Sequence, residues 1–399
     1  MKEFTQGLQL VAFALLGVAA IPLTMNQCAE MDARKRYEAR AAHHAVLGQA
    51  ALEAKDPALA AAAYAQALGY APFDAASRKG LLGAHVEQVL ADGQGITANN
   101  VLQLQTELAD AMLEGEVDAR TTLAYGRVLQ FRGKSDDARA QFRKAIEADA
   151  DQPLAHLLLG DALLKAGEYD AAAAALDRSL ELDPQQPLAE FALGQVRVQQ
   201  EKWDDAAKLL ESASRSVHNP QLYTALGRAQ VERQKWEEAQ KALERAIALD
   251  PAQTVAYALL GDTYLKTNRV EAAVKAFEAS WERARDVESL RKLARLHQGM
   301  QAWERAGELF GQLRLLLPDD PEPHCGIGTA ADNMGQMELA VGAYGKCAEL
   351  AQKRPDQAEL AQRALLRVAA IQKEHMKAPE KGDKKDDKKG DKKRGDQPK

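Results

Sequence analysis

Small and apolar residues recur three or four positions apart along most of this chain, which is the spacing of one face of an α-helix. Three stretches are almost alike: WDDAAKLLESA from Trp203, WEEAQKALERA from Trp236 and WERAGELFGQL from Trp303. A catalytic centre needs its groups once, whereas a stacked array needs the same packing contact at every step. The pattern therefore predicts a repeated structural unit.

The repeat can be counted from one small residue in each copy, which we call the anchor. An alanine stands twelve positions after the anchor, and a large apolar residue follows four positions later, as in Gly160, Ala172 and Leu176. Several copies end in a proline such as Pro184, which stops a helix. Gly48 begins a further copy near the N-terminus. The main anchors are Gly126, Gly160, Gly194, Gly227, Gly261, Ala294 and Gly328, with spacings of 34, 34, 33, 34, 33 and 34 residues.

This period and pattern resemble the tetratricopeptide repeat, a helix-turn-helix unit of about 34 residues. The resemblance covers residues 41 to 350 approximately. It implies an all-α fold, a right-handed superhelical solenoid of about eight or nine units that ends in a capping helix. In each unit a small anchor on the first helix and an alanine on the second should allow close helix packing. Trp203, Trp236, Trp303 and Tyr169 should begin second helices and fill the joints.

We expect the solenoid to occupy residues 28–376. One unit, at about 73–116, departs from the pattern, because Gly83 lacks the alanine at the expected offset and GQGITANN adds a loop. We interpret it as a degenerate repeat. An amphipathic helix over about 355–376 should cap the last unit. Its predicted apolar stripe consists of Leu360, Ala364, Leu365, Val368 and Ile371.

Residues 8–25, LQLVAFALLGVAAIPLTM, form the long apolar run of the chain. Its length lies between that of a signal-peptide core and that of a membrane span, which needs about 20 residues. We favour an uncleaved transmembrane anchor over residues 1–27, because an A-x-A cleavage site is missing. Cleavage after Ala20 and a lipid on Cys28 are the alternatives.

Basic residues next to a span tend to stay in the cytoplasm. Only Lys2 precedes the apolar run, whereas Arg34, Lys35, Arg36 and Arg40 follow it. A cytoplasmic solenoid on the bacterial inner membrane is therefore slightly favoured over a periplasmic one, which a signal-peptide-like start would indicate.

Charge adds two expectations. The tail over residues 377–399 has ten basic and six acidic residues and no large apolar one, so we expect it to be disordered. The whole chain has a net charge of −6, which argues against a nucleic-acid partner, because such proteins concentrate positive charge against phosphate.

The chain shows no phosphate loop, no nucleophile or zinc-protease motif and no paired Cys and His ligands. We therefore expect no enzyme, no metal site and no cofactor. His43 and His44 are adjacent and diverge on a helix. Cys325 and Cys347 flank Gly335, the centre of a predicted hairpin, so they can face each other. Two buried thiols are the favoured interpretation, because a disulfide would require export.

A binding surface remains. In the tetratricopeptide family the first helices line a concave groove that holds peptides or helices, and residues three before and one after each anchor should face it. The groove would be apolar in the middle and basic towards Arg291, which suits a peptide with apolar anchors and an acidic end. The predicted groove residues are Leu157, Asp161, Phe191, Gln195, Thr224, Arg228, Asp262, Arg291 and Arg295.

The resemblance and the apolar N-terminal run together indicate a membrane-tethered, non-enzymatic scaffold of bacterial envelope type, with protein or peptide partners and an oligomeric state left open. The alternatives are a periplasmic assembly chaperone for secreted or outer-membrane proteins, and a substrate-adaptor subunit of an enzyme complex. Fold alone does not distinguish these functions.

Overall fold

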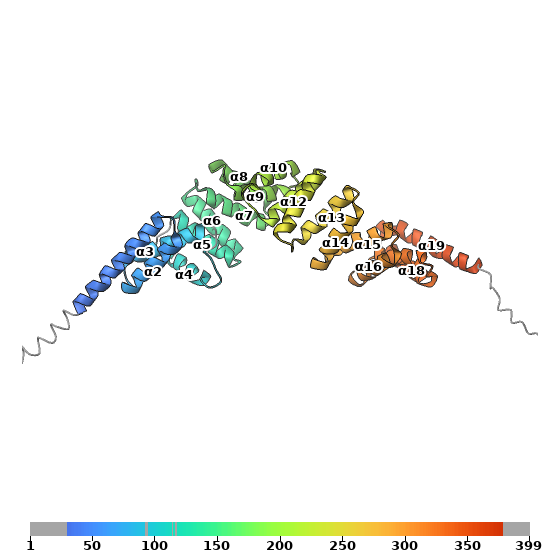
Figure 1. Ribbon diagram of the computed structural model, residues 1–399, viewed down its shortest axis with the longest axis horizontal. Helices are drawn as coiled ribbons and strands as arrows, with labels where there is room; N and C mark the ends of the chain where they lie inside the picture. Colours follow the sequence, from blue (N-terminus) through green and yellow to red (C-terminus); the bar gives the residue numbers. More distant parts are fainter. Residues whose placement is uncertain (1–29, 92–94, 114, 116–117, 378–399) are drawn as a thin grey trace, which may run out of the picture. The chain divides into compact units, whose positions relative to one another are not determined.

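The computed structural model describes residues 30–91, 95–113, 115 and 118–377. The described residues are helical and contain no strand (Figure 1). They divide into two compact units, with the division between His218 and Asn219. No helix in this described part has both the length and the apolar character needed to cross a membrane. The predicted anchor over 1–27, Cys28 and the tail after residue 377 lie outside the described residues.

Helices pair consecutively in each unit, as the sequence predicts. The first unit contains a helix over residues 30–53, followed by α2 (Pro57–Tyr70), α3 (Ala75–Leu90), α4 (Val101–Leu113), α5 (Ala119–Phe131), α6 (Ser135–Ala148), α7 (Pro153–Lys165), α8 (Tyr169–Leu182), α9 (Pro187–Gln199) and α10 (Trp203–Ala213). The second unit contains α11 (Pro220–Glu232), α12 (Trp236–Leu249), α13 (Thr254–Lys266), α14 (Val270–Ala284), α15 (Val287–Gly299), α16 (Trp303–Leu316), α17 (Pro321–Asn333), α18 (Met337–Gln352), the 3₁₀ helix η1 (Pro355–Gln357) and α19 (Ala358–Lys377). The described residues thus form five helix pairs in the first unit, and four pairs followed by α19 in the second.

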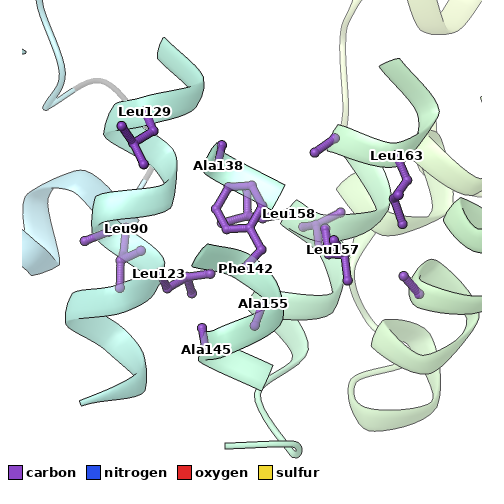
Figure 2. Close-up of a cluster of buried hydrophobic side chains, with 14 of the residues drawn as sticks. Leu90, Leu123, Leu129, Ala138, Phe142, Ala145, Ala155, Leu157, Leu158 and Leu163 are labelled. Carbon is purple, nitrogen blue, oxygen red and sulfur yellow. The ribbon is translucent and has the colours of Figure 1, made fainter. Parts of the chain in front are cut away.

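Each anchor glycine is the place where a first helix meets a large side chain of its partner helix. A Cβ atom added to Gly126 would lie 2.5 Å from Phe142, and one added to Gly160 would lie 2.5 Å from Leu176. Figure 2 shows Phe142 between the helix that carries Leu123 and Leu129 and the helix that carries Leu157 and Leu158. The anchor therefore makes room for the large residue sixteen positions later, more than for the alanine twelve positions later.

The repeat with an alanine anchor keeps this packing in another way. Ala294 lies opposite Phe310, which is only 1% exposed. The next first helix supplies the missing space, because a Cβ atom on Gly326 would lie 2.4 Å from the Phe310 ring. In this repeat the glycine that faces the aromatic ring is therefore Gly326, on the next first helix.

In the helix pairs other than α3 and α4, the turn requires left-handed backbone at one position, seven residues after the anchor. The three glycines Gly133, Gly167 and Gly335 occupy it with φ of 74°, 78° and 75°. The other pairs use residues with side chains, namely Lys55, Glu201, Gln234, Asn268 and Gln301, with φ between 57° and 60°. The following N–H donates back to the carbonyl five residues earlier, as from Ala302 to His297 at 2.9 Å, which closes a Schellman-type helix end.

The aromatic residues at the starts of second helices lie where the sequence predicts them. Trp203, Trp236 and Trp303 are the first residues of α10, α12 and α16, and Tyr169 begins α8; all four are half-buried. Tyr169 packs against the core of the first unit.

A helix pair occupies the region of the predicted degenerate repeat. Its helices α3 and α4 flank a turn in which Thr97 N–H donates to Asn100 Oδ1 at 2.7 Å and Asn100 Nδ2 donates to the Gly95 carbonyl at 2.7 Å. No atom lies within 4 Å of a Cβ placed on Gly83. This glycine therefore has no large partner, consistent with the missing alanine.

Helix α19 packs on α18 and covers the last hairpin. Leu360, Ala364, Val368 and Ile371 belong to the core that it shares with Ala348 and Tyr344. Leu365 was expected in this stripe, but it is 46% exposed. The buried side is centred on Ala361, Ala364 and Ile371, and Leu365 stands about 100° from Ala364 around the helix.

Candidate functional site

The first helices of successive pairs lie side by side within each unit. In the first unit α7 contacts both α5 and α9, and in the second unit α11 contacts α13 and α15 contacts α17. Polar side chains bridge neighbouring first helices, as in Gln130 Nε2 to Asp161 Oδ2 at 3.1 Å and Lys292 Nζ to Asp262 at 2.8 Å. We call the surface formed by these helices the first-helix face of each unit.

The predicted residues of the first unit lie on its first-helix face with different exposures. Leu157 is 9% exposed and contributes to the core, whereas Asp161, Phe191 and Gln195 are half-buried. Asp161 also pairs with Lys165 at 2.6 Å. Leu188, three residues before Phe191 on the same side of α9, is 56% exposed. Phe191 and Leu188 therefore offer apolar surface, and Leu157 serves mainly as packing.

A cleft of about 540 Å³ opens near the start of the same unit. It is lined by Leu90 of α3, Arg120 of α5 and Leu154 of α7, so it lies across neighbouring first helices. Arg120 binds both carboxylate oxygens of Glu87 at 2.7 Å. These two opposite charges at the rim of the cleft therefore pair with each other. The remaining lining is mostly aliphatic and includes Leu52 and Pro57.

The predicted residues of the second unit are more polar. Thr224 uses its hydroxyl to donate to the Pro220 carbonyl of its own helix at 2.9 Å, and Arg228 is exposed. Asp262 is bound by Lys292 of the next first helix. Of these three residues, Arg228 presents its charge to solvent.

Arg291 and Arg295 do not form the basic end that the sequence predicts. Arg291 binds Asp320 at 2.9 Å and also contacts Glu322, and Arg295 binds Glu322 at 2.6 Å. The hydrogen bond to Glu322 raises the pKa of Arg295. Burial opposes the charge of Arg291, but its bonds to Glu322 and Asp320 outweigh burial and raise its pKa. These carboxylates neutralise both guanidinium groups, so an acidic end on a partner peptide gains little here.

A second cleft, of about 390 Å³, lies on the first-helix face near the end of the second unit. Its lining includes Arg295, Cys325 and Thr329. Cys325 and Thr329 stand three before and one after the anchor Gly328, so they occupy groove offsets that the predicted set did not include. The same counting rule, continued by one repeat, would have found them.

Cys325 and Cys347 are joined by a disulfide, with Cα atoms 5.2 Å apart. The bond ties α17 to α18 across the last hairpin, around the turn at Gly335. This pairing replaces the favoured interpretation of two free thiols. The two residues face each other because their offsets from the hairpin centre are nearly equal, as the sequence analysis allowed.

An aromatic cluster near the N-terminal end of the first unit was not anticipated. His44 stacks on Tyr70 with ring centroids 5.7 Å apart, and Tyr37 lies 6.1 Å from the same ring. The rings of His43 and His44 also lie edge to face with centroids 5.5 Å apart, although the sequence predicts that these two side chains diverge. Across the residues that the structure describes, no group of three or more His, Cys, Asp or Glu side chains converges to hold a metal ion.

Antiparallel helix pairs that stack through one repeated joint define the chain as a helical-repeat protein, a class in which each repeat contacts its neighbours. The particular repeat is the tetratricopeptide repeat. Models of this family match residues 123–187, and also 163–230, 197–248 and 230–296. Residues 123–296 are therefore tetratricopeptide repeats, and the fold is that of a protein-interaction scaffold. A search of curated proteins found no match.

Solved structures with a similar fold include a fragment of MamA from Desulfovibrio magneticus RS-1, which is 22% identical, with 42% of this chain and 95% of that chain covered and a TM-score of 0.38. YrrB, described as a tetratricopeptide protein with an unusual peptide-binding site, is 22% identical over 56% of this chain and 97% of its own, with a TM-score of 0.35. The Cut9–Hcn1 complex of the APC/C is 14% identical over 78% and 63%, with a TM-score of 0.44. These low scores support no argument about partners.

Proposed function

We propose that this chain is a non-enzymatic scaffold whose first-helix face holds a peptide or helix of a partner protein, during assembly or regulation of a bacterial envelope complex. The repeat family supports the binding role. In such an array the packing joint is repeated from unit to unit, whereas the residues of the first-helix face differ. The core residues maintain the fold, and the exposed residues are the ones that can contact partners.

The observation that carries the proposal is the apolar surface on the first unit. Leu188 is 56% exposed beside half-buried Phe191, and the aliphatic cleft with Leu90 and Leu154 lies on the same series of first helices. Apolar side chains of a partner can be buried at such positions, and this burial is favourable for an amphipathic helix that lies in a groove. We therefore expect a ligand selected by apolar anchors, without a strict charge requirement.

The disulfide supports one choice of compartment for this proposal. Disulfides persist in the periplasm and other oxidising compartments and are rare in the cytoplasm. The pairing of Cys325 with Cys347 therefore supports a periplasmic array, against the slight preference for the cytoplasm that basic residues 34–40 indicate. A tether through residues 8–25 is compatible with either side and belongs to this proposal.

The disulfide between Cys325 and Cys347 also favours a second candidate, a periplasmic assembly chaperone for secreted or outer-membrane proteins. A chaperone would bind many apolar segments weakly, whereas a scaffold would bind one segment selectively. Both functions use the first-helix face, so the sequence preference of the bound peptides distinguishes them.

Selection of random displayed peptides on the full chain tests the proposal. We compare the wild type with Leu188→Asp, which places a charge on the first-helix face, and with Leu102→Asp. Leu102 is a matched control, because it is 61% exposed and lies on α4, the second helix of its pair. Peptides enriched by the wild type should bind the Leu102 variant equally and the Leu188 variant at least about tenfold more weakly.

Two other results would decide against the first-helix face. Equal binding by both variants would place the ligand elsewhere, and an equal loss in both would indicate a general effect of added charge. A single consensus among the enriched peptides supports the scaffold, and enrichment of diverse apolar peptides supports the chaperone.

A further inference from the structure

Helix α19 has an apolar surface on the side that faces away from the hairpin it caps. Leu366 is 64% exposed and Leu365 is 46% exposed, although the helix already buries Ala361, Ala364 and Ile371 against α18. A terminal capping helix usually has a polar outer side, because the array stops there. Leu365 and Leu366 are adjacent, so together they give this side of α19 an apolar surface that another helix can cover.

The residues that follow α19 cannot cover these leucines. Residues 378–399 contain no Val, Ile, Leu, Met, Phe, Tyr or Trp, and most of them are Lys and Asp. Such a segment has no side chain that would gain by packing on Leu366. A helix that covers them would therefore not come from residues 378–399, and the sequence of α19 indicates which helix fits.

The outer side of α19 is nearly symmetric about Leu366. Glu359 lies seven residues before Leu366, and Lys373 lies seven residues after it. Seven residues are two helical turns, so all three side chains point within about 20° of one direction, and each charge lies about 10 Å from Leu366 along the axis. All three are exposed. The residues between them on this side are Gln362, Arg363, Ala369 and Ala370.

This arrangement matches a second copy of itself. When two α19 helices run antiparallel with their Leu366 side chains in contact, Glu359 of each copy lies opposite Lys373 of the other. Two ion pairs then flank a central leucine contact, and Ala369 and Ala370 allow the helix axes to approach closely. Because a two-fold interface presents the same surface twice, such self-complementary charge is its characteristic feature.

We propose that α19 is a self-association helix, through which two copies of this chain join by antiparallel packing centred on Leu366. This goes beyond peptide binding, since its central residue, Leu366, lines neither of the two clefts described above. One helix from each copy buries less area than a standard stable interface, so the association is weak and depends on concentration. Glu359, which contacts Arg363 in the single chain, exchanges or shares this exposed pair at a small cost.

The experiment uses the full chain in a mild detergent solution, with two distinguishable fluorescent labels, and measures association by sedimentation velocity. The variants are Glu359→Lys, Lys373→Glu and Leu366→Asp. Leu315→Asp is the matched control, because Leu315 is 78% exposed on α16, away from the proposed contact. Circular dichroism of each variant checks that the helices are retained.

The proposal expects association of the wild type and of the Leu315 variant, and a loss of at least about tenfold in the Leu366 variant. Each single charge variant should associate more weakly, because like charges meet at both ends. A mixture of Glu359→Lys with Lys373→Glu should recover association as a complex of the two variants, since both end pairs become Lys opposite Glu again.

The proposal is wrong if the wild type remains a monomer throughout the concentration range, which would leave α19 to a different protein. It is also wrong if the mixture associates no better than either variant alone, because a parallel or unrelated contact would not exchange the charges in this way. Association that survives Leu366→Asp would place the interface on another surface.

Discussion

The left-handed turn position predicts that glycine stabilises this chain where it now has glutamine. Gln301 has φ of 60° at the turn between α15 and α16, the position at which Gly133, Gly167 and Gly335 stand in other repeats. A residue with a side chain loses about 1–2 kcal/mol in this conformation. Glycine avoids that strain but gives the unfolded chain more freedom, worth about 0.4–1 kcal/mol. We therefore expect Gln301→Gly to raise the free energy of unfolding by about 0.5–1 kcal/mol.

The control is Gln312→Gly in the same repeat. Gln312 is also exposed, but it lies inside α16, where glycine costs about 1 kcal/mol. Both variants change the unfolded chain alike, so the difference between them isolates the turn. It should amount to about 1.5–2 kcal/mol with the glycine at the turn more stable.

Urea unfolding of the full chain, followed by circular dichroism, provides the measurement. Repeat arrays need not unfold in one step, so the comparison uses the transition that contains the second unit, identified with a variant of that unit alone. Gln234→Gly, at the equivalent turn two repeats earlier, should add its own increment. The reasoning fails if Gln301→Gly destabilises the second unit as much as Gln312→Gly does.

Three further outcomes are expected from the same assay. Gly160→Ala should lower the free energy of unfolding by about 1–3 kcal/mol, because its Cβ would lie 2.5 Å from the facing Leu176 side chain. Gly83→Ala is the control and should be neutral or stabilising, because no atom lies within 4 Å of its Cβ. A loss of stability in both variants would contradict the anchor packing. The double variant Cys325→Ala and Cys347→Ala should lower the free energy of unfolding of the last hairpin by about 3 kcal/mol, which is the loop entropy for a separation of 22 residues. Labelling of both thiols in oxidising conditions, without prior reduction, would show that the disulfide is absent. Burial lowers the pKa of His297 below its ordinary 6.5. Protonation of His297 is therefore less favourable in the folded chain, and stability should fall as the pH drops below about 6.5. His297→Leu should reduce this loss between about pH 7.5 and pH 5.5, and an unchanged pH profile would refute the assignment of the loss to His297.

The helix pairs were predictable because their signals are local. The small anchor, the alanine twelve residues later and the aromatic residue at the start of the second helix all act on helices adjacent in sequence, and Gly160 and Trp203 lie where they were expected. The turn conformation was not predictable from residue type, because Gly167, Glu201 and Asn268 occupy the same position. The backbone there follows from the joint between two helices, and the side chain only changes its cost.

The location of residues on the first-helix face was predictable, but the ion pairs that these residues form were not. Counting from the anchors located Phe191 on the first-helix face, and one more repeat would have located Cys325. The expected basic end at Arg291 and Arg295 was wrong in character, because Glu322 binds both. Glu322 is 31 residues from Arg291 in the chain and lies on the next first helix, so spacing within one helix does not reveal their contact.

By itself the sequence determined the all-α class, the length of the repeat and most of the buried positions of its helices, because these follow from spacing within one turn or one hairpin. Only the tertiary structure decided which charges are neutralised, that Cys325 and Cys347 are joined, and that Leu365 and Leu366 of α19 stay exposed. Each of these depends on the distance between side chains in neighbouring repeats or across a hairpin, and stacking sets that distance.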